Sequence, residues 1–358
     1  MDSMDNNATA LELFVKYEND SCHVDSSFRY ITFTVFYSLI FIVGGISNCY
    51  VLWVFTDMYP LKGMNDIKIY MINLTVADLL FLITLPLWIY YYHNLGNWTL
   101  PSFLCNLAGF LFFVNTYCSV AFLTVISYNR YHAVTKPLEA AQSSPRFRGL
   151  IISLIIWLVI AASASPYLFM ESLNKDGSMM RCFEGYTSNE ISVAITHLII
   201  IALFFIVFIL IIFCNLLIIR TLLSQSVQTQ VGNRGAVKQR ALWMVCAVLL
   251  VFIICFVPHH LIDGPWTMAV LGLWKKGNCD LLQSLNDLHQ VTLLLMGLNC
   301  TLDPILYCFA TKKFRRHLTE RIRNMGSRKC SKSTTVSGIS FENHTNGHPL
   351  FMENLAKE

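Results

Sequence analysis

The sequence predicts an all-α membrane protein, a seven-transmembrane-helix bundle followed by a short amphipathic helix. Two observations predict this fold: 55% of the 358 residues are hydrophobic and only 13% are charged, and the apolar residues are gathered in long runs. Soluble domains usually carry about 25% charged residues, so this chain needs a lipid solvent or an unusually large core.

Seven charge-poor stretches recur along the chain, and each is near or above the ~20 residues that a helix needs to cross a bilayer core. They are roughly Tyr30–Thr56, Ile69–Tyr92, Asn106–Tyr128, Leu150–Met170, Ile191–Ile219, Ala241–Ile262 and Leu288–Ala310. In hydrocarbon, each spanning segment must satisfy its own backbone polar groups, so seven runs predict seven helices. The alternative, a soluble helical bundle, would need polar outer faces, and the stretches do not show them.

The Lys and Arg residues choose the orientation of these seven crossings. With residues 1–29 outside, inner segments hold 20 Lys and Arg residues and outer segments hold 6. The positive-inside bias therefore predicts an extracellular N-terminus, residues 1–29, and a cytoplasmic C-terminus in a multi-pass plasma-membrane protein. Residues 1–29 contain no apolar run typical of a cleaved signal peptide, so the first helix is expected to direct insertion.

The outer segments carry the residues expected to be modified in an oxidising compartment. Four cysteines lie there, which predicts two disulfides with three alternative pairings: Cys22, Cys105, Cys182 and Cys279. Asn7, Asn19 and Asn97 begin Asn-x-Ser/Thr sequences in outer segments and are expected to carry glycans.

The membrane-spanning core covers residues 30–310, and the segment after it divides into two parts. Phe314, Leu318 and Ile322 recur every four residues between basic ones, which predicts an amphipathic helix over 311–326 on the inner leaflet. Cys330 is a candidate palmitoylation site, and a free tail cysteine is the alternative. Residues 327–358 are rich in Ser and Thr near their start and are predicted to be disordered and open to phosphorylation.

Two acidic residues fall within the predicted membrane helices, Asp78 in the second stretch and Asp303 in the seventh. An acid at the bilayer centre costs about 2.5–3.5 kcal/mol on insertion scales and usually marks function. Asn115, Ser119 and Asn299 offer oxygen atoms at comparable depth, so a site for a hard cation or for water is expected. The alternative is a hydrogen-bond network that joins the helices, and both readings can hold together.

The sixth stretch predicts a cavity that opens outward. Phe252, Phe256, His259 and Asp263 follow helical spacing, and this stripe runs from apolar at depth to ionisable near the outside. Four prolines inside predicted helices are expected to kink them: Pro86, Pro166, Pro258 and Pro304.

Spaced motifs in or beside six of the seven stretches show that residues 39–310 resemble the rhodopsin-like, class A, G-protein-coupled receptor family. The matches are Gly45-x-x-Asn48, Leu74-x-x-Ala77-Asp78, Cys105, Asn129-Arg130-Tyr131, Trp157, Phe252-x-x-Cys255-Phe256-x-Pro258 and Asn299-x-x-x-Asp303-Pro304-x-x-Tyr307. Each motif alone is weak, but their order and helical placement together are very specific.

The resemblance implies roles for individual residues. Cys105 should bridge to Cys182, and Arg130 should engage the G protein's C-terminal helix. The residues implied in coupling and activation are Asn129, Arg130, Tyr131, Phe256, Pro258, Asp303, Pro304 and Tyr307. The sodium pocket implied by the family falls on Asp78, Asn115, Ser119, Asn299 and Asp303, with Asp78 as the metal ligand.

This chain departs from the family's pattern at three places. Asn129 replaces the usual Asp, so Arg130 lacks that neighbouring ionic partner and the inactive state is expected to be held less firmly. Phe256 stands where Trp is usual. The fifth helix lacks the usual proline and carries Cys214-Asn215 where a Tyr is expected, so the details of the activation relay are open.

The resemblance also implies partners. These are heterotrimeric G proteins of the calcium-mobilising and adenylyl-cyclase-inhibiting types, with arrestin and receptor kinases at the tail. No catalytic triad, metal-ligand spacing or Gly-rich phosphate loop is recognisable in the sequence, so we expect neither an enzyme nor a nucleic-acid-binding protein, and no cofactor beyond an allosteric sodium ion. A transporter or channel is the alternative outside the family, and the Arg130 and Asp303-Pro304 motifs disfavour it.

Single residues argue against three classes of ligand that the family binds. Retinal needs a lysine where Gly297 stands, amine hormones need an acid where Phe112 stands, and nucleotides usually need a cation where Asp263 stands. The remaining candidates for ligand contact are rich in rings and imidazoles: Trp88, Tyr92, Phe112, Phe113, Tyr117, His197, His259, His260, Asp263, Trp266, His289, Gln290 and Thr292.

Longer runs resemble the members of this family that bind an ether phospholipid with a phosphocholine head and drive calcium, inflammatory and chemotactic responses. The runs are Leu79–Trp88, Asn115–Phe122, Ala241–Cys246, Phe252–His260, His289–Leu293 and Thr311–Phe314. Another lipid, a nucleotide or a peptide is the alternative ligand within the family.

The side chains suit that phospholipid. A quaternary ammonium is best held by ring faces, each worth about 0.5–2 kcal/mol, and a phosphate needs donors. The expected cage is Trp88, Tyr92, Phe112 and Tyr117, and the expected donors are His197, His259 and His260. Asp263 is expected either to attract the choline cation or to cap an outer hydrogen-bond network. A Cys22–Cys279 disulfide is expected to brace the entrance.

Overall fold

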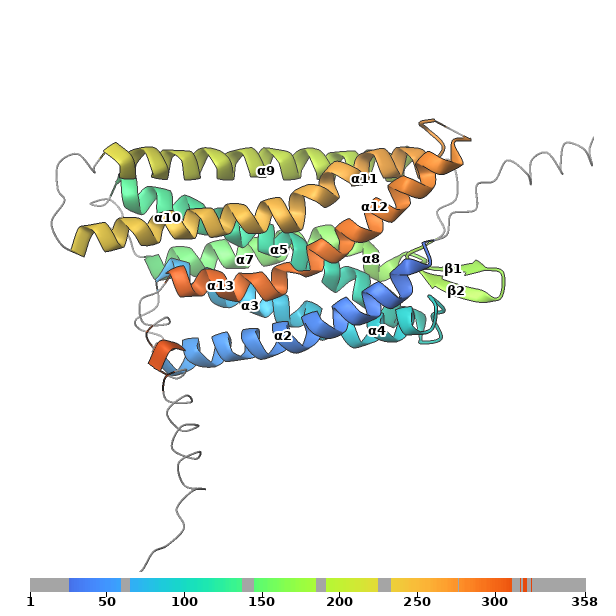
Figure 1. Ribbon diagram of the computed structural model, residues 1–358, viewed down its shortest axis with the longest axis horizontal. Helices are drawn as coiled ribbons and strands as arrows, with labels where there is room; N and C mark the ends of the chain where they lie inside the picture. Colours follow the sequence, from blue (N-terminus) through green and yellow to red (C-terminus); the bar gives the residue numbers. More distant parts are fainter. Residues whose placement is uncertain are drawn as a thin grey trace, which may run out of the picture. The chain divides into compact units, whose positions relative to one another are not determined.

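The apolar stretches form long helices in the computed structural model, which describes residues 26–58, 65–136, 145–184, 191–224, 233–275 and 277–310, and residues 316, 318–320 and 323. The long helices run side by side (Figure 1). In chain order the α-helices of the described residues, short ones included, are α2 (Phe28–Met58), α3 (Asp66–Leu82), α4 (Leu85–His93), α5 (Ser102–Thr135), α7 (Pro145–Ala164), α8 (Pro166–Phe169), α9 (Ile191–Ser224), α10 (Asn233–Val251), α11 (Val257–Val270), α12 (Cys279–Gly297) and α13 (Asn299–Ala310).

Six helical segments among the described residues are long and apolar enough to cross a membrane. They are Phe28–Asp57, Asp66–His93, Ser102–Thr135, Arg146–Phe169, Ala194–Leu222 and Leu242–Val270. The seventh segment of the bundle consists of α12, which packs against α11, and α13, which packs against α2 and α10. This seventh segment is interrupted at Leu298, and α12 begins with polar residues. Its length and composition therefore identify it as a membrane span less clearly than those of the other six.

Breaks in the helices follow the prolines. Pro86 and Pro166 lie in the first turns of α4 and α8, and Pro258 follows a π-helical turn over Phe252–Phe256 at the start of α11. Proline is tolerated at a helix start because its missing N–H has no partner there anyway. Pro304 lies inside α13, six residues after the interruption at Leu298.

A two-stranded hairpin, which the sequence analysis did not predict, lies between α8 and α9 in the chain. Strands β1 (Leu173–Asp176) and β2 (Met179–Cys182) pair antiparallel. Gly177 turns the chain with φ of +59°, a conformation that favours glycine. The hairpin is docked on the loop after α4, because the Trp98 N–H donates to the Met180 carbonyl at 2.7 Å.

The disulfide implied by the resemblance, Cys105–Cys182, is confirmed and ties the end of β2 to the first turn of α5. Cys279 is also disulfide-bonded. Cys22 lies outside the described residues, so its pairing with Cys279 stays a prediction.

Candidate functional site

A cavity of about 980 Å³ lies between the helices and the hairpin, and most of the predicted contact residues line it. Those lining it are Trp88, Tyr92, Phe112, Phe113, Tyr117, His197, His259, Asp263, Trp266, His289 and Gln290. His260 and Thr292 are not among its lining residues. The cavity lies in the size range of drug-sized ligand sites, about 300–1,000 Å³.

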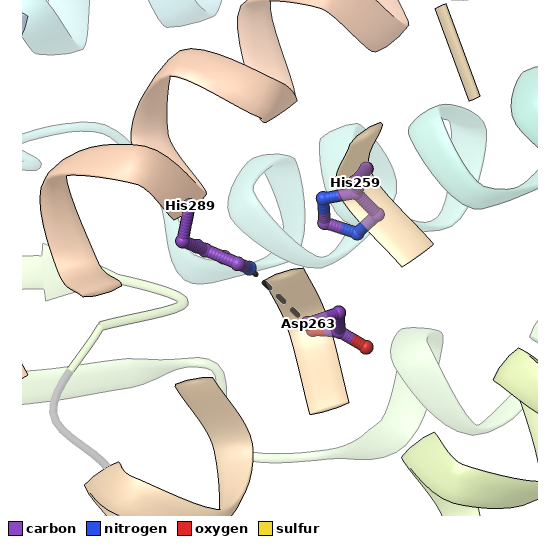
Figure 2. Close-up of side chains that lie close together, drawn as sticks. All are labelled: His259, Asp263 and His289. Carbon is purple, nitrogen blue, oxygen red and sulfur yellow. Dashed lines mark ion pairs between the residues drawn. The ribbon is translucent and has the colours of Figure 1, made fainter. Parts of the chain in front are cut away.

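One wall of the cavity is a cluster of imidazoles around Asp263, which is 5% exposed. Asp263 Oδ2 lies 2.9 Å from His197 Nδ1, and Asp263 Oδ1 lies 3.5 Å from His289 Nε2. His259 stands one helical turn before Asp263 on α11, and Figure 2 shows both facing His289 of α12. Asp263 therefore belongs to a hydrogen-bond network on the cavity wall, and its predicted attraction of a choline cation stays a prediction.

His260 takes a different position from its neighbour His259. Its ring is stacked on Phe204 with centroids 3.7 Å apart, and its Nδ1 lies 2.9 Å from the Phe256 carbonyl oxygen. Its Nε2 faces the Tyr117 hydroxyl at 3.3 Å. His260 is thus packed between helices, where it contacts Tyr117, and it does not line the cavity. Its side chain points about 100° away from that of His259, which does line the cavity.

The four residues expected to form one aromatic cage fall into separate ring groups. Trp88 and Tyr92 are stacked with centroids 6.2 Å apart. Tyr117 packs on Phe113 at 4.3 Å, and Phe112 contacts Phe81 at 5.6 Å. The cavity therefore offers ring faces from more than one side.

An ion pair that the sequence analysis missed closes part of the cavity. Arg29 Nη2 donates to Glu184 Oε2 at 2.7 Å, and the side chains are only 10% and 23% exposed. The Tyr91 hydroxyl donates to Glu184 Oε1 at 2.8 Å. Both charged groups line the cavity, so it contains a cation and an anion beside the rings of Trp88 and Tyr92. The sequence marks these two residues only weakly. Arg29 is a charged residue at the start of an apolar helix, and Glu184 follows Cys182 by two residues.

Phe183 reaches the cavity by lying directly on α5. Its backbone has φ of +56°, and its ring occupies the space where a side chain at Gly109 would stand. A Cβ at Gly109 would lie only 2.3 Å from the ring. Gly109 is therefore required for the close approach of the segment after the hairpin to α5.

The two predicted membrane acids, Asp78 and Asp303, are fully buried within the bundle, and together with Asn115, Ser119 and Asn299 they form the acidic seam. Asn115 Nδ2 donates to Asp78 Oδ1 at 3.0 Å, and Asn299 Nδ2 donates to Ser119 Oγ at 3.1 Å. Asp78 Oδ2 and both carboxylate oxygens of Asp303 have no hydrogen-bond partner within the described part of the chain. Three unpaired buried carboxylate oxygens beside amide and hydroxyl groups fit a small hard cation.

Several predicted residues lie at or beyond the edges of the described chain. Asn129, Arg130 and Tyr131 are in the last turns of α5, with Asn129 buried. Asn97 is half-buried, and its Oδ1 accepts a hydrogen bond from the Met180 N–H at 3.0 Å. Outside the described residues or side chains are Asn7, Asn19, Tyr307, Cys330 and most of the proposed helix 311–326, and these predictions stay predictions.

Comparisons with known proteins bear on the whole bundle. Residues 47–307 match the family described as 7 transmembrane receptor (rhodopsin family). The chain is 56% identical over 342 residues to the platelet-activating factor receptor of Cavia porcellus, covering 93% of this chain and 98% of that one. It is 57% identical over 324 residues to the Homo sapiens protein of the same name, covering 88% and 93%. It is 30% identical over 298 residues to lysophosphatidic acid receptor 6 of Gallus gallus, covering 82% and 94%.

Proposed function

The chain belongs to the rhodopsin family of seven-transmembrane receptors, and from this premise we propose that it is a cell-surface receptor for platelet-activating factor, an ether phospholipid with a phosphocholine head. It is a multi-pass membrane protein. The observation that carries the proposal is that one cavity offers ring faces, a cation and imidazoles together. Two relatives at 56–57% identity that bear this ligand's name support the same choice.

The head group is matched by two features of the cavity. The quaternary ammonium cannot donate hydrogen bonds, and the ring faces of Trp88 and Tyr92 attract it at about 0.5–2 kcal/mol each. The phosphate needs N–H donors, which the Arg29 guanidinium and the His259 ring offer from the cavity lining. The Arg29–Glu184 pair supplies charges of both signs, as a zwitterionic head requires.

A calcium-release assay in transfected cells tests the ligand. Platelet-activating factor is expected to release calcium at concentrations where its form lacking the acetyl group does not. Lysophosphatidic acid is tested as the alternative agonist, because a 30% identical relative carries its name. A response to lysophosphatidic acid but not to platelet-activating factor would overturn the proposal, and untransfected cells are the control.

Signalling is assigned to the opposite end of the bundle. We propose that heterotrimeric G proteins, leading to calcium release and inhibition of adenylyl cyclase, bind beside Arg130, and that arrestin and receptor kinases act on the tail. This requires an extracellular N-terminus in the plasma membrane. Epitope tags at the two ends test it: the N-terminal tag should be stained on intact cells, and the C-terminal tag only after permeabilisation.

We also propose that a sodium ion binds in the acidic seam. Asp78 and Asp303 would supply carboxylate oxygens. Asn115 orients Asp78 by its hydrogen bond, and Asn299 donates to both Asn115 and Ser119. The ion would neutralise charge that is otherwise buried without a partner. Agonist affinity should fall when Na⁺ replaces N-methylglucamine at equal ionic strength, and Asp78→Asn should remove that difference. A wild-type receptor insensitive to Na⁺ would contradict the site.

A further inference from the structure

The imidazole and carboxylate cluster on the cavity wall has the composition of a transition-metal site. His259, Asp263 and His289 each offer one ligand atom, and these three atoms lie within 4.8 Å of one another. Figure 2 shows the three side chains converging from two helices. Two imidazoles and a carboxylate are ligands typical of zinc, with metal–ligand distances of about 2.0–2.2 Å. We propose that this trio binds Zn²⁺ and joins α11 to α12.

One pair of the trio has the spacing of two ligands of a tetrahedral ion. His259 and Asp263 lie four residues apart, so they project from the same face of α11. His289 on α12 supplies the third ligand across the helix interface. Its Nε2 lies 3.5 Å from Asp263 Oδ1, which is long for a charge-assisted hydrogen bond. Two ligands of one tetrahedral zinc are about 3.3–3.5 Å apart, so the pair already has that separation.

Neighbouring side chains orient the three ligands. His197 Nδ1 holds Asp263 Oδ2 at 2.9 Å, which leaves Asp263 Oδ1 for an ion. Trp266 stacks on the His289 ring at 3.8 Å and fixes its plane. Outer-shell hydrogen bonds and packing of this kind orient metal ligands in known sites.

An unpaired buried atom is the second indication of a missing partner. His289 is 7% exposed, and its Nδ1 has no hydrogen-bond partner among the described residues. The other nitrogen makes only the long contact with Asp263. Such a ring is poorly satisfied as a hydrogen-bonding group. An ion bound to Nε2 would replace the long contact with Asp263 and leave Nδ1 as the protonated nitrogen of a neutral, metal-bound imidazole. With three protein ligands on the cavity wall, the fourth position faces the cavity, as in open zinc sites.

Direct metal binding tests the proposal without any phospholipid. The full-length receptor, purified through a tag that contains no histidine, is treated with chelator and titrated with ZnCl₂ by calorimetry. One Zn²⁺ per receptor is expected, and Zn²⁺ should raise Tm. Co²⁺ in its place should give the visible absorption of a four-coordinate ion. Absence of a stoichiometric site, or a six-coordinate Co²⁺ spectrum, would overturn the proposal.

Variants assign the ion to these residues. His259→Ala, Asp263→Asn and His289→Ala should each weaken Zn²⁺ binding about tenfold or more, since loss of even an outer-shell partner can cost that much. The matched control is His93→Ala at an exposed position, which should bind as the wild type does. Unchanged affinity in the three variants, or its loss in the control, would refute the assignment.

Two measurements distinguish loss of the metal site from misfolding of a variant. The melting temperature of each variant in chelator shows whether it remains folded before metal is added. His289→Cys keeps a ligand of different softness, so it should bind Cd²⁺ more tightly relative to Zn²⁺ than the wild type does. Failure of that shift in a folded variant would exclude His289 as a ligand. Since no phospholipid is present, the outcome is independent of the proposed receptor ligand.

Discussion

The indole of Trp266 and the imidazole of His289 are stacked nearly parallel, with centroids 3.8 Å apart and planes 6° apart. Trp266 comes from α11 and His289 from α12, so the stack links the two helices at the cavity wall. The Trp266 Nε1–H donates to Asn286 Oδ1 at 3.1 Å, which fixes the indole against α12.

Trp266→Leu should therefore weaken binding of platelet-activating factor. An aromatic pair is worth about 0.5–1.5 kcal/mol beyond its buried area, which corresponds to a loss of about two- to tenfold in affinity. Competition binding on membranes measures it. Trp266→Phe keeps the stack and loses only the hydrogen bond to Asn286, so its loss should be smaller. Equal losses in the two variants would show that the stack does not orient His289.

The Arg29–Glu184 pair predicts a measurable coupling. Arg29→Ala and Glu184→Ala should each lower ligand affinity and thermal stability, because each leaves a largely buried charge without its partner. The double variant should lose less than the sum, with an interaction of about 0.5–3 kcal/mol. A thermal-shift series on the four purified proteins measures this cycle. Additive losses would mean that the two charges act separately despite their 2.7 Å contact.

Much of the bundle could be predicted because lipid imposes its constraints locally. A spanning helix must be long and apolar by itself, so charge-poor stretches marked all seven segments, and six of the described helical segments are long and apolar enough to cross a membrane. A polar cluster that includes Asp78, Asn115, Ser119 and Asn299 was predicted for a similar reason. In the structure, hydrogen bonds join Asp78 with Asn115 and Asn299 with Ser119. Polar residues inside hydrocarbon have few partners other than one another.

The hairpin, the imidazole cluster and the placement of His260 were not predictable from the sequence. The hairpin is short, and its docking depends on the Cys105–Cys182 bond and on Trp98. The clustering of His259, Asp263 and His289 was not predicted, because His289 lies on another helix and no local spacing in the sequence links it to the other two. His260 was grouped with His259, but adjacent residues on a helix point about 100° apart and therefore meet different neighbours.

The Cys105–Cys182 disulfide predicts a strong effect on surface delivery. Cys182→Ser should release β2 from α5 and cost about 2–5 kcal/mol of stability, the usual range for a native disulfide. Flow cytometry of an N-terminal tag should show reduced surface expression, and ligand binding should be lost. Cys49 is a free, exposed cysteine, so Cys49→Ser is the matched control and should behave as the wild type. Normal binding by Cys182→Ser would show that the hairpin stays in place without its covalent bond.

The contact between Gly109 and Phe183 provides the sharpest steric prediction. Gly109→Ala would place a methyl group 2.3 Å from the Phe183 ring, so the ring must leave its position against α5. Because Phe183 lines the cavity and continues directly from Cys182, its displacement should alter the cavity wall. We expect a clear loss of ligand affinity, measured by saturation binding, with surface expression retained because the ring can swing into the cavity.

Gly45→Ala is the control for this change, because a Cβ at Gly45 meets no atom within 4 Å. In a helix, alanine is favoured over glycine by about 0.5–1 kcal/mol, so Gly45→Ala should bind ligand normally and be at least as stable as the wild type. The double variant Gly109→Ala with Phe183→Leu then separates steric displacement from other effects. If displacement of the ring is the cause, the smaller side chain should restore part of the affinity that Gly109→Ala loses. No recovery in the double variant, together with a normal melting temperature, would contradict the steric account.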